Sequence, residues 1–259
     1  MTGELTGKRI VITGGARGMA AAMVRDFVRH GAVVVAFDID EIGGRATADS
    51  ATADGPGRAE FVACDVSSEP SVLAAFADAV SRLGGLDGLV HAAGIAPGAP
   101  AETITLADWD SVFAVNARGT FLTNQAAFPY LKSRGGRILN FASSAGMSGL
   151  PGKAHYSAAK GAVLAWTRTI AQEWGRYAIT ANAIAPAIWT PMYAKTRSLM
   201  SETQLADHDR IIAAQMPIDG RLGDPDRDLA PVLRFLMGDG ARFITGQTIA
   251  IDGGLVMVR

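Results

Sequence analysis

The sequence predicts an α/β fold, a doubly wound sheet of about seven parallel strands with helices on both faces. Short runs rich in β-branched and apolar residues alternate regularly with helix-like stretches along the 259 residues. The apolar runs are continuous and do not alternate with polar residues, which is typical of parallel strands buried on both faces. No change of composition marks a boundary, so we expect residues 1–259 to form a single domain.

The first repeating unit predicts a dinucleotide site. Residues 8–13 form a strand-like run, residues 14–20 a glycine-rich turn and residues 21–30 a helix-like stretch. A second strand-like run, residues 33–37, ends in Asp38. Strand, glycine turn, helix, strand and acid, in this order, form the dinucleotide-binding unit of Rossmann-type folds.

The glycine-rich turn contains several predicted cofactor contacts. Gly14 permits the tight bend, and Gly18 lets the backbone approach a pyrophosphate at the start of the helix. Arg17 and Met19 flank Gly18 and are predicted to contact the cofactor with it. Ala20 stands where a third glycine is common. That position serves helix–strand packing, so we expect a small positional shift and no loss of binding.

The alternation continues to the end of the chain. Further strand-like runs cover residues 59–64, 86–90, 137–141, 179–185 and 247–251. Further helix-like stretches cover residues 70–83, 106–116, 119–131 and 155–174. With the two strands of the first unit, these runs complete the predicted seven-stranded sheet.

The composition argues against several classes of protein. The net charge of -1 gives no basic surface for nucleic acid. No zinc-type motif such as Cys-x-x-Cys occurs, so no metal site is predicted. The single cysteine, Cys64, is typical of a reducing compartment. Without a signal-peptide core or a membrane-length apolar run, we expect a soluble cytoplasmic protein with no membrane or nucleic-acid partner.

Ser143, Tyr156 and Lys160 are the candidate catalytic group. Tyr156 and Lys160 are four residues apart in a helix-like stretch, so their side chains share one helix face. A nearby ammonium favours phenolate, so we expect Lys160 to lower the Tyr156 pKa and make it a usable proton donor or acceptor. Ser143 follows the strand-like run 137–141, and its hydroxyl could point into the same cleft. Taken alone, the pair is more often an ordinary Tyr and Lys on a solvated helix face.

The whole set of motifs resembles the short-chain dehydrogenase/reductase family over essentially the full chain. The matching pieces, in family order, are Thr13-Gly14-x-x-x-Gly18, Asp38, Asp65-Val66, Ala92-Ala93-Gly94, Val115-Asn116, Ser143, Tyr156-x-x-x-Lys160 and the tail 243–254. Any single piece could occur by chance, but the correctly spaced set is highly specific. The resemblance implies an NAD(P)-dependent oxidoreductase, and it favours a functional interpretation of Tyr156 and Lys160.

The resemblance also implies a role for each residue. Tyr156 acts as the general acid in carbonyl reduction and as the general base in alcohol oxidation. Lys160 holds the nicotinamide ribose and lowers the Tyr156 pKa, and Ser143 hydrogen-bonds the substrate oxygen. Asn116 supports a water that links Lys160 to solvent. The remaining implied cofactor contacts are Asp65, Val66, Ala92, Gly94, Ile188 and Thr190, together with Tyr156 and Lys160 themselves.

Asp38 favours NAD over NADP as the cofactor. Its carboxylate can accept hydrogen bonds from the adenosine ribose hydroxyls, and its charge would repel a 2′-phosphate. Residues 39–41 supply no cation to offset that charge. Arg17 is the counter-argument, because a basic residue before the second glycine often accompanies NADP in the family. An ordinary exposed acid is the alternative interpretation of Asp38, and its place at a strand end argues against it.

Three further positions depart from the family pattern. His91 replaces the usual Asn before Ala-Ala-Gly, and we interpret it as a hydrogen-bonded structural side chain. The loop that normally reads Asn-x-x-x-Pro-Gly lacks the glycine and one residue at 186–190. The geometry of Ile188 and Thr190, the predicted nicotinamide and pyrophosphate contacts, therefore depends on a shortened loop. His155 is interpreted as a substrate-side or incidental residue.

Residues 190–217 are the expected substrate-binding lid. Their apolar and methionine content favours an apolar ketone or secondary alcohol as the substrate, although the same residues could simply pack the lid down. Residues 94–100 form the expected facing rim. They carry no cation, so the rim gives no signal for an acidic or phosphopantetheine group.

The leading hypothesis is an NAD-dependent alcohol dehydrogenase or ketone reductase that acts on a small molecule. An NADPH-dependent 3-oxoacyl-thioester reductase is the closest alternative, and a non-catalytic cofactor-binding protein is a second. A serine hydrolase is disfavoured because Ser143 lacks the Gly-x-Ser-x-Gly elbow. The resemblance implies a homotetramer, formed through the tail strand and the helices around 105–131 and 155–174.

Overall fold

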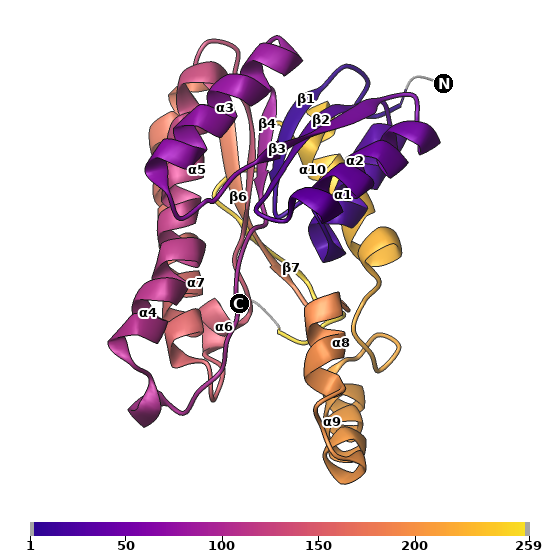
Figure 1. Ribbon diagram of the computed structural model, residues 1–259, viewed down its shortest axis with the longest axis vertical. Helices are drawn as coiled ribbons and strands as arrows, with labels where there is room; N and C mark the ends of the chain where they lie inside the picture. Colours follow the sequence, from indigo (N-terminus) through magenta and orange to yellow (C-terminus); the bar gives the residue numbers. More distant parts are fainter. Residues whose placement is uncertain (1–2, 257–259) are drawn as a thin grey trace.

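A seven-stranded, all-parallel sheet forms the centre of the protein in the computed structural model, which describes residues 3–256. The strand order is β3-β2-β1-β4-β5-β6-β7. The strands are β1 (Arg9–Thr13), β2 (Val33–Asp38), β3 (Arg58–Ala63), β4 (Gly88–His91), β5 (Gly136–Phe141), β6 (Ile179–Pro186) and β7 (Thr248–Ile251). The predicted α/β fold with about seven parallel strands is confirmed (Figure 1).

Within the described residues, ten α-helices surround the sheet or extend beyond its lower edge, as seen in Figure 1. They are α1 (Gly18–Arg29), α2 (Glu41–Asp54), α3 (Glu69–Leu83), α4 (Leu106–Phe113), α5 (Gly119–Leu131), α6 (Ala145–Ser148), α7 (Ala154–Trp174), α8 (Pro191–Arg197), α9 (Glu202–Gln215) and α10 (Ala230–Met237). Helices α1, α2 and α10 cover one face of the sheet, and α3, α5 and α7 cover the other. This two-sided cover explains why the strands carry continuous apolar runs.

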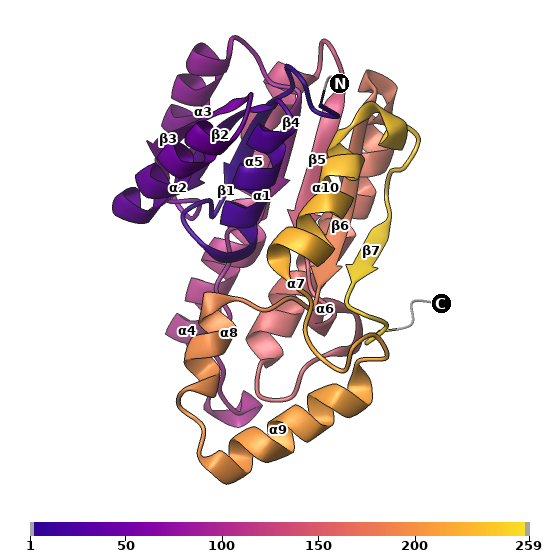
Figure 2. The ribbon, with the colours of Figure 1, turned by 90° about the vertical axis from the view of Figure 1, so that its right-hand side faces the viewer.

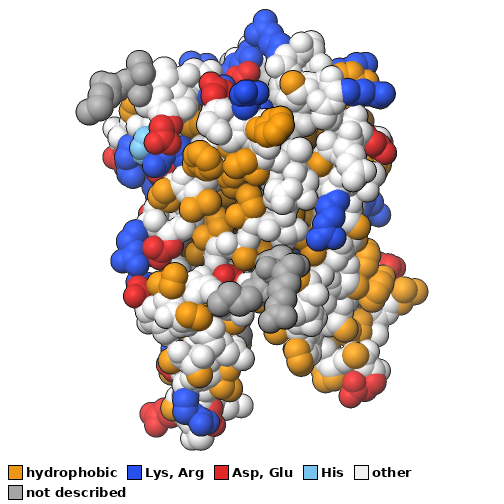
Figure 3. Space-filling view, turned by 180° about the vertical axis from the view of Figure 1, so that it is seen from behind, with side chains coloured by type: hydrophobic (Ala, Val, Ile, Leu, Met, Phe, Trp, Pro, Cys, Tyr) orange, Lys and Arg blue, Asp and Glu red, His pale blue; other side chains and the backbone are white. Residues whose placement is uncertain are grey.

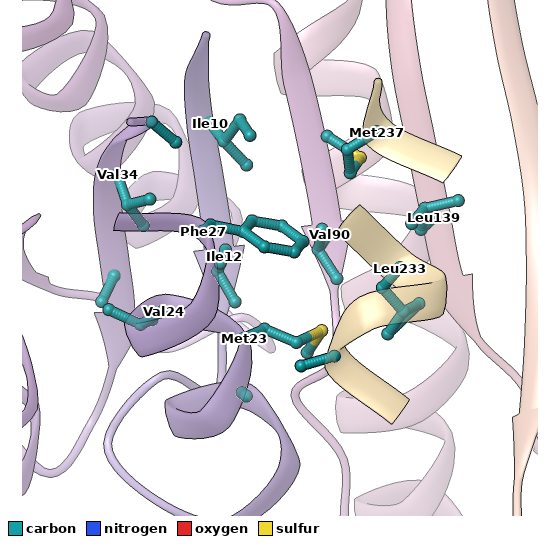
Figure 4. Close-up of a cluster of buried hydrophobic side chains, with 14 of the residues drawn as sticks. Ile10, Ile12, Met23, Val24, Phe27, Val34, Val90, Leu139, Leu233 and Met237 are labelled. Atoms are coloured by element: carbon teal, nitrogen blue, oxygen red, sulfur yellow. The ribbon is translucent and has the colours of Figure 1, made fainter. Parts of the chain in front are cut away.

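Strands β1 to β6 each supply side chains to two separate cores. Ile10 and Ile12 of β1 pack with Phe27 of α1 and Leu233 of α10, as Figure 4 shows. Val11, between them in the sequence, belongs to the opposite core. Successive side chains of a strand point to opposite faces, so both faces of β1 must be apolar.

Some helices differ from the sequence prediction. Helix α1 begins at Gly18, three residues before the predicted start, because the turn merges directly into the helix. Helix α2 was not predicted. Its buried face consists only of Gly44, Ala48 and Ala51, whose small side chains produce a weak apolar signal. Helix α10 was also missed, and the 190–217 segment contains two helices, α8 and α9.

The carboxyl ends of the strands define where a site can form. In register, Thr13 of β1 lies beside His91 of β4, and His91 lies beside Asn140 of β5. The order of connection reverses between β1 and β4, and ligands bind at such a switch point in open α/β sheets. Helices α8 and α9 lie beyond this same edge (Figure 2).

Candidate active site

A cleft opens at the carboxyl edge of β1, β2 and β4. Gly14 and Gly18 bound the turn after β1 and have φ angles of 75° and 61°, which favour glycine. A side-chain carbon at Gly14 would lie 3.1 Å from the backbone of Ala93, so the turn packs directly on the β4 loop. The lining of the cleft comprises Gly14, Arg17, Gly18, Met19, Ala20, Asp38, Ile39, Cys64, Val66, Ala92, Ala93, Gly94, Ile95, Val115, Thr190, Pro191 and Met192.

Most of the cofactor contacts that the sequence predicts therefore line one cleft, but Asp65, Tyr156, Lys160 and Ile188 do not. Asp65 is exposed, and its carboxylate accepts hydrogen bonds from the backbone and hydroxyl of Ser67 at 2.9 and 2.7 Å. The Ile188 side chain is buried in the core on the α1 face of the sheet. Asp65 thus fixes the start of the next segment, and Ile188 anchors its loop.

Asp38 is held firmly at the end of β2. One carboxylate oxygen accepts from the amide of Ala16 at 3.0 Å, and the other accepts from the amide of Asp40 at 3.0 Å. Each oxygen keeps further lone pairs for a ligand. Arg17 lines the same cleft but is exposed, so its position is less constrained than that of Asp38.

Ser143 follows β5 and is half-buried. Its hydroxyl oxygen accepts a hydrogen bond of 3.1 Å from the amide of Ala145 in α6. Because the oxygen acts as an acceptor in this contact, its hydrogen remains free to donate to another group. Ser143 lies close enough to Tyr156 to influence its titration.

Lys160 is a buried cation beside Tyr156. Its ammonium nitrogen lies 5.8 Å from the centre of the Tyr156 ring and donates a 2.6 Å hydrogen bond to the carbonyl oxygen of Phe141. The side chain is 4% exposed, and burial lowers the pKa of Lys160 to about 8. Burial disfavours the charged form, which explains the direction of the shift.

The Tyr156 pKa differs from the sequence expectation. Burial of the phenol raises the pKa of Tyr156 above its ordinary value, and the nearby Ser143 hydroxyl acts in the opposite direction. The expectation that Lys160 holds this pKa below its usual range is wrong for this arrangement. Removal from water outweighs the effect of the Ser143 hydroxyl. The Lys160 ammonium donates to the Phe141 carbonyl rather than to the phenol.

Asn116 lies in a π-helical turn, Ala114–Arg118, that joins α4 to α5. Its side-chain nitrogen donates to the carbonyl oxygens of Ile95 and Val112 at 2.9 and 3.0 Å. Its side-chain oxygen is buried and has no partner among residues 3–256. A side-chain carbon at Gly94 would lie 2.7 Å from this oxygen and 3.5 Å from the Lys160 nitrogen, so both atoms face one space that glycine leaves open.

His91 is fully buried beneath the cleft. Its Nδ1 atom lies 2.9 Å from the Thr123 hydroxyl and 3.2 Å from the Thr13 hydroxyl. Burial, assisted by the charge of Lys160, lowers the pKa of His91 to about 3, so the ring is neutral at physiological pH. The predicted role as a hydrogen-bonded structural side chain fits the Nδ1 atom. The Nε2 atom is buried and has no partner in the described part of the chain.

His155 is also buried, at 1% exposure, in the first turn of α7. Helix α7, which carries Tyr156, is in contact with α4.

The shortened loop after β6 has a defined backbone. The amide of Ala187 donates to Ile251 at 2.9 Å, and the amide of Trp189 donates to Gly223 at 2.8 Å. The hydroxyl of Thr190 accepts from the amide of Tyr193 at 3.1 Å and thereby caps α8. These bonds hold the loop so that Thr190 lines the cleft.

Helices α8 and α9 are joined to each other by polar contacts. The Tyr193 hydroxyl lies 2.6 Å from the Nε2 atom of His208, and Arg197 of α8 forms a two-point ion pair with Asp209 of α9. Figure 3 shows a notch at the lower end of the molecule, between this projection and the one that carries α4 and α6. The two helices thus form one wall of an open groove below the strands.

Several lining residues were missed by the sequence analysis. Cys64, Ile39, Ala93, Ile95 and Val115 line the cleft next to residues that were predicted. Ile39, Cys64, Ala93 and Ile95 follow strand ends, so strand-end position would have identified their segments. Val115 lies in the π-helical turn between α4 and α5 and follows no strand. The choice between adjacent residues depends on which side chain turns inward, and this is set by packing.

Comparisons with known proteins agree with this geometry. A family model described as enoyl-(acyl carrier protein) reductase matches residues 14–256. The chain is 36% identical to 2-(S)-hydroxypropyl-CoM dehydrogenase 3 of Xanthobacter autotrophicus, over 100% of both chains. It is 36% identical to 3-oxoacyl-(acyl-carrier-protein) reductase FabG of Thermotoga maritima, over 98% of this chain and 100% of that protein. The crystal structure of levodione reductase superposes with a TM-score of 0.90 at 32% identity, covering 96% of this chain and 98% of the other.

The chain belongs to the short-chain dehydrogenase/reductase family. As a member of the family it is an NAD(P)-dependent oxidoreductase that transfers a hydride, in agreement with the sequence prediction. None of the helices in the described part of the chain has the length and apolar character needed to cross a bilayer.

Proposed function

We propose that this short-chain dehydrogenase/reductase transfers a hydride between NAD(H) and a secondary alcohol or ketone, with Tyr156 as the acid and base. One observation carries the proposal: Ser143, Tyr156 and Lys160 are neighbours at the carboxyl edge of the sheet, beside the cleft that holds Asp38. A proton donor, a hydroxyl and a cation thus lie next to the cleft lined by the glycine turn and Asp38.

The residues present fit a nicotinamide dinucleotide. Gly14 and Gly18 leave the backbone uncovered at the start of α1, where a pyrophosphate is stabilised by free amides and the helix dipole. Asp38 would accept from the adenosine ribose, while Thr190 would contact the other end of the cofactor. When bound, the nicotinamide supplies or accepts the hydride.

In carbonyl reduction, side chains of this protein would supply the proton. The free hydrogen of Ser143 would donate to the substrate oxygen, and the neutral phenol of Tyr156 would deliver the proton to it. The raised pKa of Tyr156 keeps the phenol protonated at neutral pH. This state suits a donor in reduction, whereas oxidation needs the phenolate.

Lys160 and Asn116 would restore that proton. The Lys160 pKa of about 8 allows both of its protonation states near neutral pH. The unpartnered oxygen of Asn116 and the Lys160 ammonium face the space beside Gly94, which offers polar partners to a water. A water there would connect Lys160 toward solvent.

We favour NAD over NADP because of Asp38. Its two backbone hydrogen bonds fix a carboxylate in the cleft, where a 2′-phosphate would be repelled. Arg17 lines the same cleft, but it is exposed and forms no ion pair with Asp38 in the described structure.

The lid and the assembly are part of the same proposal. Residues 190–217 would close over the substrate, and the exposed Met192, Leu199 and Ile211 would give an apolar contact surface. A homotetramer is supported by exposed apolar side chains, including Phe235 on α10, Phe243 before β7, and Trp109 and Phe121 on α4 and α5. Apolar side chains also gather on the face shown in Figure 3. We propose one domain and a cytoplasmic location, the latter from the single, unpaired Cys64.

The experiment is a cofactor titration followed by a substrate panel. NADH and NADPH are titrated against the purified protein, and secondary alcohols, ketones and 3-oxoacyl thioesters are then assayed with each cofactor. Tighter binding of NADH and turnover of simple ketones or alcohols is the expected result. Tighter binding of NADPH would contradict the argument from Asp38.

The reductase from Thermotoga maritima favours a second candidate, an NADPH-dependent 3-oxoacyl-thioester reductase. Preferential turnover of 3-oxoacyl thioesters with NADPH would support it. A non-catalytic cofactor-binding protein predicts binding of NADH with no turnover of any substrate in the panel.

A further inference from the structure

Lys153 places a second ammonium group near Tyr156, and the proposed mechanism does not use it. Lys153 lies just before α7, and its backbone pairs with Ala99 in a short parallel bridge. Its ammonium nitrogen donates a 2.7 Å hydrogen bond to the carbonyl oxygen of Ala96. The same nitrogen lies 5.9 Å from the centre of the Tyr156 ring.

Lys153 and Lys160 occupy different settings around the Tyr156 ring. Lys160 is buried and directs its ammonium inward to the Phe141 carbonyl. Lys153 is half-buried and directs its ammonium to the rim formed by residues 94–100, which follows β4. The rim has no cation of its own, but the fold brings one to it from 57 residues away.

The Lys153 ammonium keeps donors that a ligand could use. An ammonium has three N–H donors, and Ala96 accepts one of them. In the part of the chain that the structure describes, no carboxylate pairs with Lys153, and burial lowers the pKa of its ammonium. Removing a cation from water without a counter-charge is costly. A neutral donor would be enough to hydrogen-bond the Ala96 carbonyl. The positive charge of Lys153 therefore suggests that it also attracts an anionic ligand.

The rim leaves room for this side chain. A side-chain carbon at Gly98 would lie 3.7 Å from Cε of Lys153 and only 3.2 Å from the Gly152 carbonyl oxygen. The glycine thus lets the Lys153 stem pass close beneath the rim. The ammonium is thereby carried to the Ala96 carbonyl, next to the ring of the proposed proton donor.

We propose that Lys153 is a specificity-determining residue that binds a carboxylate on the substrate, a short distance from the reacting carbonyl. The inference rests on the proposed function and narrows its substrate class to keto acids and hydroxy acids. An apolar remainder of such a substrate would contact the α8–α9 wall. The Lys153 ammonium would keep its bond to Ala96 and offer its remaining donors to the carboxylate.

The test compares keto acids with their methyl esters in NADH-dependent reduction. The panel contains 2-oxo, 3-oxo and 4-oxo carboxylates, each paired with its ester. Lys153→Gln keeps a donor for Ala96 but removes the charge, and Lys153→Arg keeps the charge. Lys132→Gln, at an exposed position after α5, is the matched control. Thermal unfolding checks that all variants remain folded.

For at least one acid and ester pair, the wild type should prefer the acid by about tenfold or more in kcat/KM. Lys153→Gln should lose that preference through a higher KM for the acid, with ester turnover nearly unchanged. Lys153→Arg and Lys132→Gln should retain most of the preference for the acid over the ester. An acid-to-ester ratio that is the same in Lys153→Gln as in the wild type would overturn the assignment, and so would a wild-type preference for esters.

Failure of the proposed function has a different signature. Turnover of neutral ketones without any preference for acids contradicts only the Lys153 assignment. Absence of turnover with every ketone contradicts the proposed function. In that case, binding of a saturated carboxylate to the NAD-loaded protein decides the role of Lys153. Weaker binding by about tenfold in Lys153→Gln supports the assignment, and equal binding overturns it.

Discussion

The ammonium of Lys160 donates a 2.6 Å hydrogen bond to the carbonyl oxygen of Phe141, the last residue of β5. This contact joins helix α7 to the strand end that precedes Ser143. It fixes the distance between the two segments that carry the proposed proton donor and the proposed substrate-binding hydroxyl. It also keeps the positive charge of Lys160 buried, and burial of this charge lowers the free energy of unfolding.

Replacing Lys160 with Met should abolish activity and stabilise the cofactor-free protein. Burial holds the Lys160 pKa at about 8, below the ordinary lysine value, so the charged side chain opposes folding at neutral pH. We expect a gain of about 1 kcal/mol in the free energy of unfolding, after the loss of the donor to Phe141 is included. Urea unfolding of both proteins at the same protein concentration measures this free energy difference.

The pH dependence of this gain has a definite sign. Between pH 8 and about 10.4, unfolded Lys160 retains a proton that the folded form has lost, so wild-type stability rises with pH. The difference between Lys160→Met and the wild type should therefore narrow as pH rises through this window. Lys132→Met, at an exposed site, controls for the loss of a lysine. If the free energies of unfolding of Lys160→Met and the wild type change in parallel with pH, the explanation from the buried charge of Lys160 is contradicted.

Tyr156→Phe should lower kcat by about a hundredfold to ten-thousandfold, the usual contribution of a general acid or base. The substitution removes only the hydroxyl, so the dissociation constant for NADH should change little. Tyr130→Phe, on the exposed part of α5, is the control and should retain activity. An active Tyr156→Phe variant would show that another group supplies the proton.

The two reaction directions should depend on pH in opposite ways. Because burial raises the Tyr156 pKa, the phenol is protonated at neutral pH and the phenolate forms only under alkaline conditions. Alcohol oxidation should therefore accelerate as pH rises from 7 to 10, whereas ketone reduction should be favoured at the lower pH. Initial rates in both directions, measured with saturating cofactor, check this. Oxidation that is fastest at neutral pH would indicate a Tyr156 pKa well below the ordinary value.

Asp38→Ser should weaken NADH binding and reduce the discrimination against NADPH. The substitution removes the carboxylate that would accept from the ribose and repel a 2′-phosphate, an effect of about 1–3 kcal/mol for hydrogen bonds that involve charged groups. Fluorescence titration with both cofactors measures the ratio of dissociation constants. Glu41→Gln removes a charge three residues away outside the cleft lining and should leave the ratio unchanged. An equal ratio of NADH to NADPH dissociation constants in Asp38→Ser and the wild type would contradict the role of Asp38 in selecting NAD.

His91→Asn should make the protein less sensitive to acid. The pKa of His91 is about 3 when folded and near 6.5 when unfolded, so the unfolded state binds the extra proton between these values. Wild-type stability should thus fall as pH drops below 6.5, by about 1.4 kcal/mol at pH 5.5 from this residue. Denaturation of wild type and variant at pH 7.5 and 5.5 gives the difference. His208→Asn, on α9, is the control, and equal losses in wild type and His91→Asn would contradict the buried neutral state.

Much of the fold and part of the site follow from local features of the sequence. The positions of the seven strands in the sequence, the glycine turn and Asp38 could be predicted, because strand patterns and turn residues are recognisable within a few neighbouring residues. The spacing of Tyr156 and Lys160 likewise follows from the helix period. Helix α2 escaped prediction because its buried face is made of alanine and glycine, which contribute too little apolar character to form a pattern.

The electrostatics and the rim of the site were decided by the tertiary structure alone. Burial raises the Tyr156 pKa against the effect expected from Lys160, and it keeps His91 neutral. The same packing brings the Asn116 oxygen to Lys160 across Gly94, and Lys153 to the Ala96 carbonyl. Periodicity and turns are properties of neighbouring residues, so the sequence determines them directly. Desolvation and contacts between distant segments depend on how the whole chain packs.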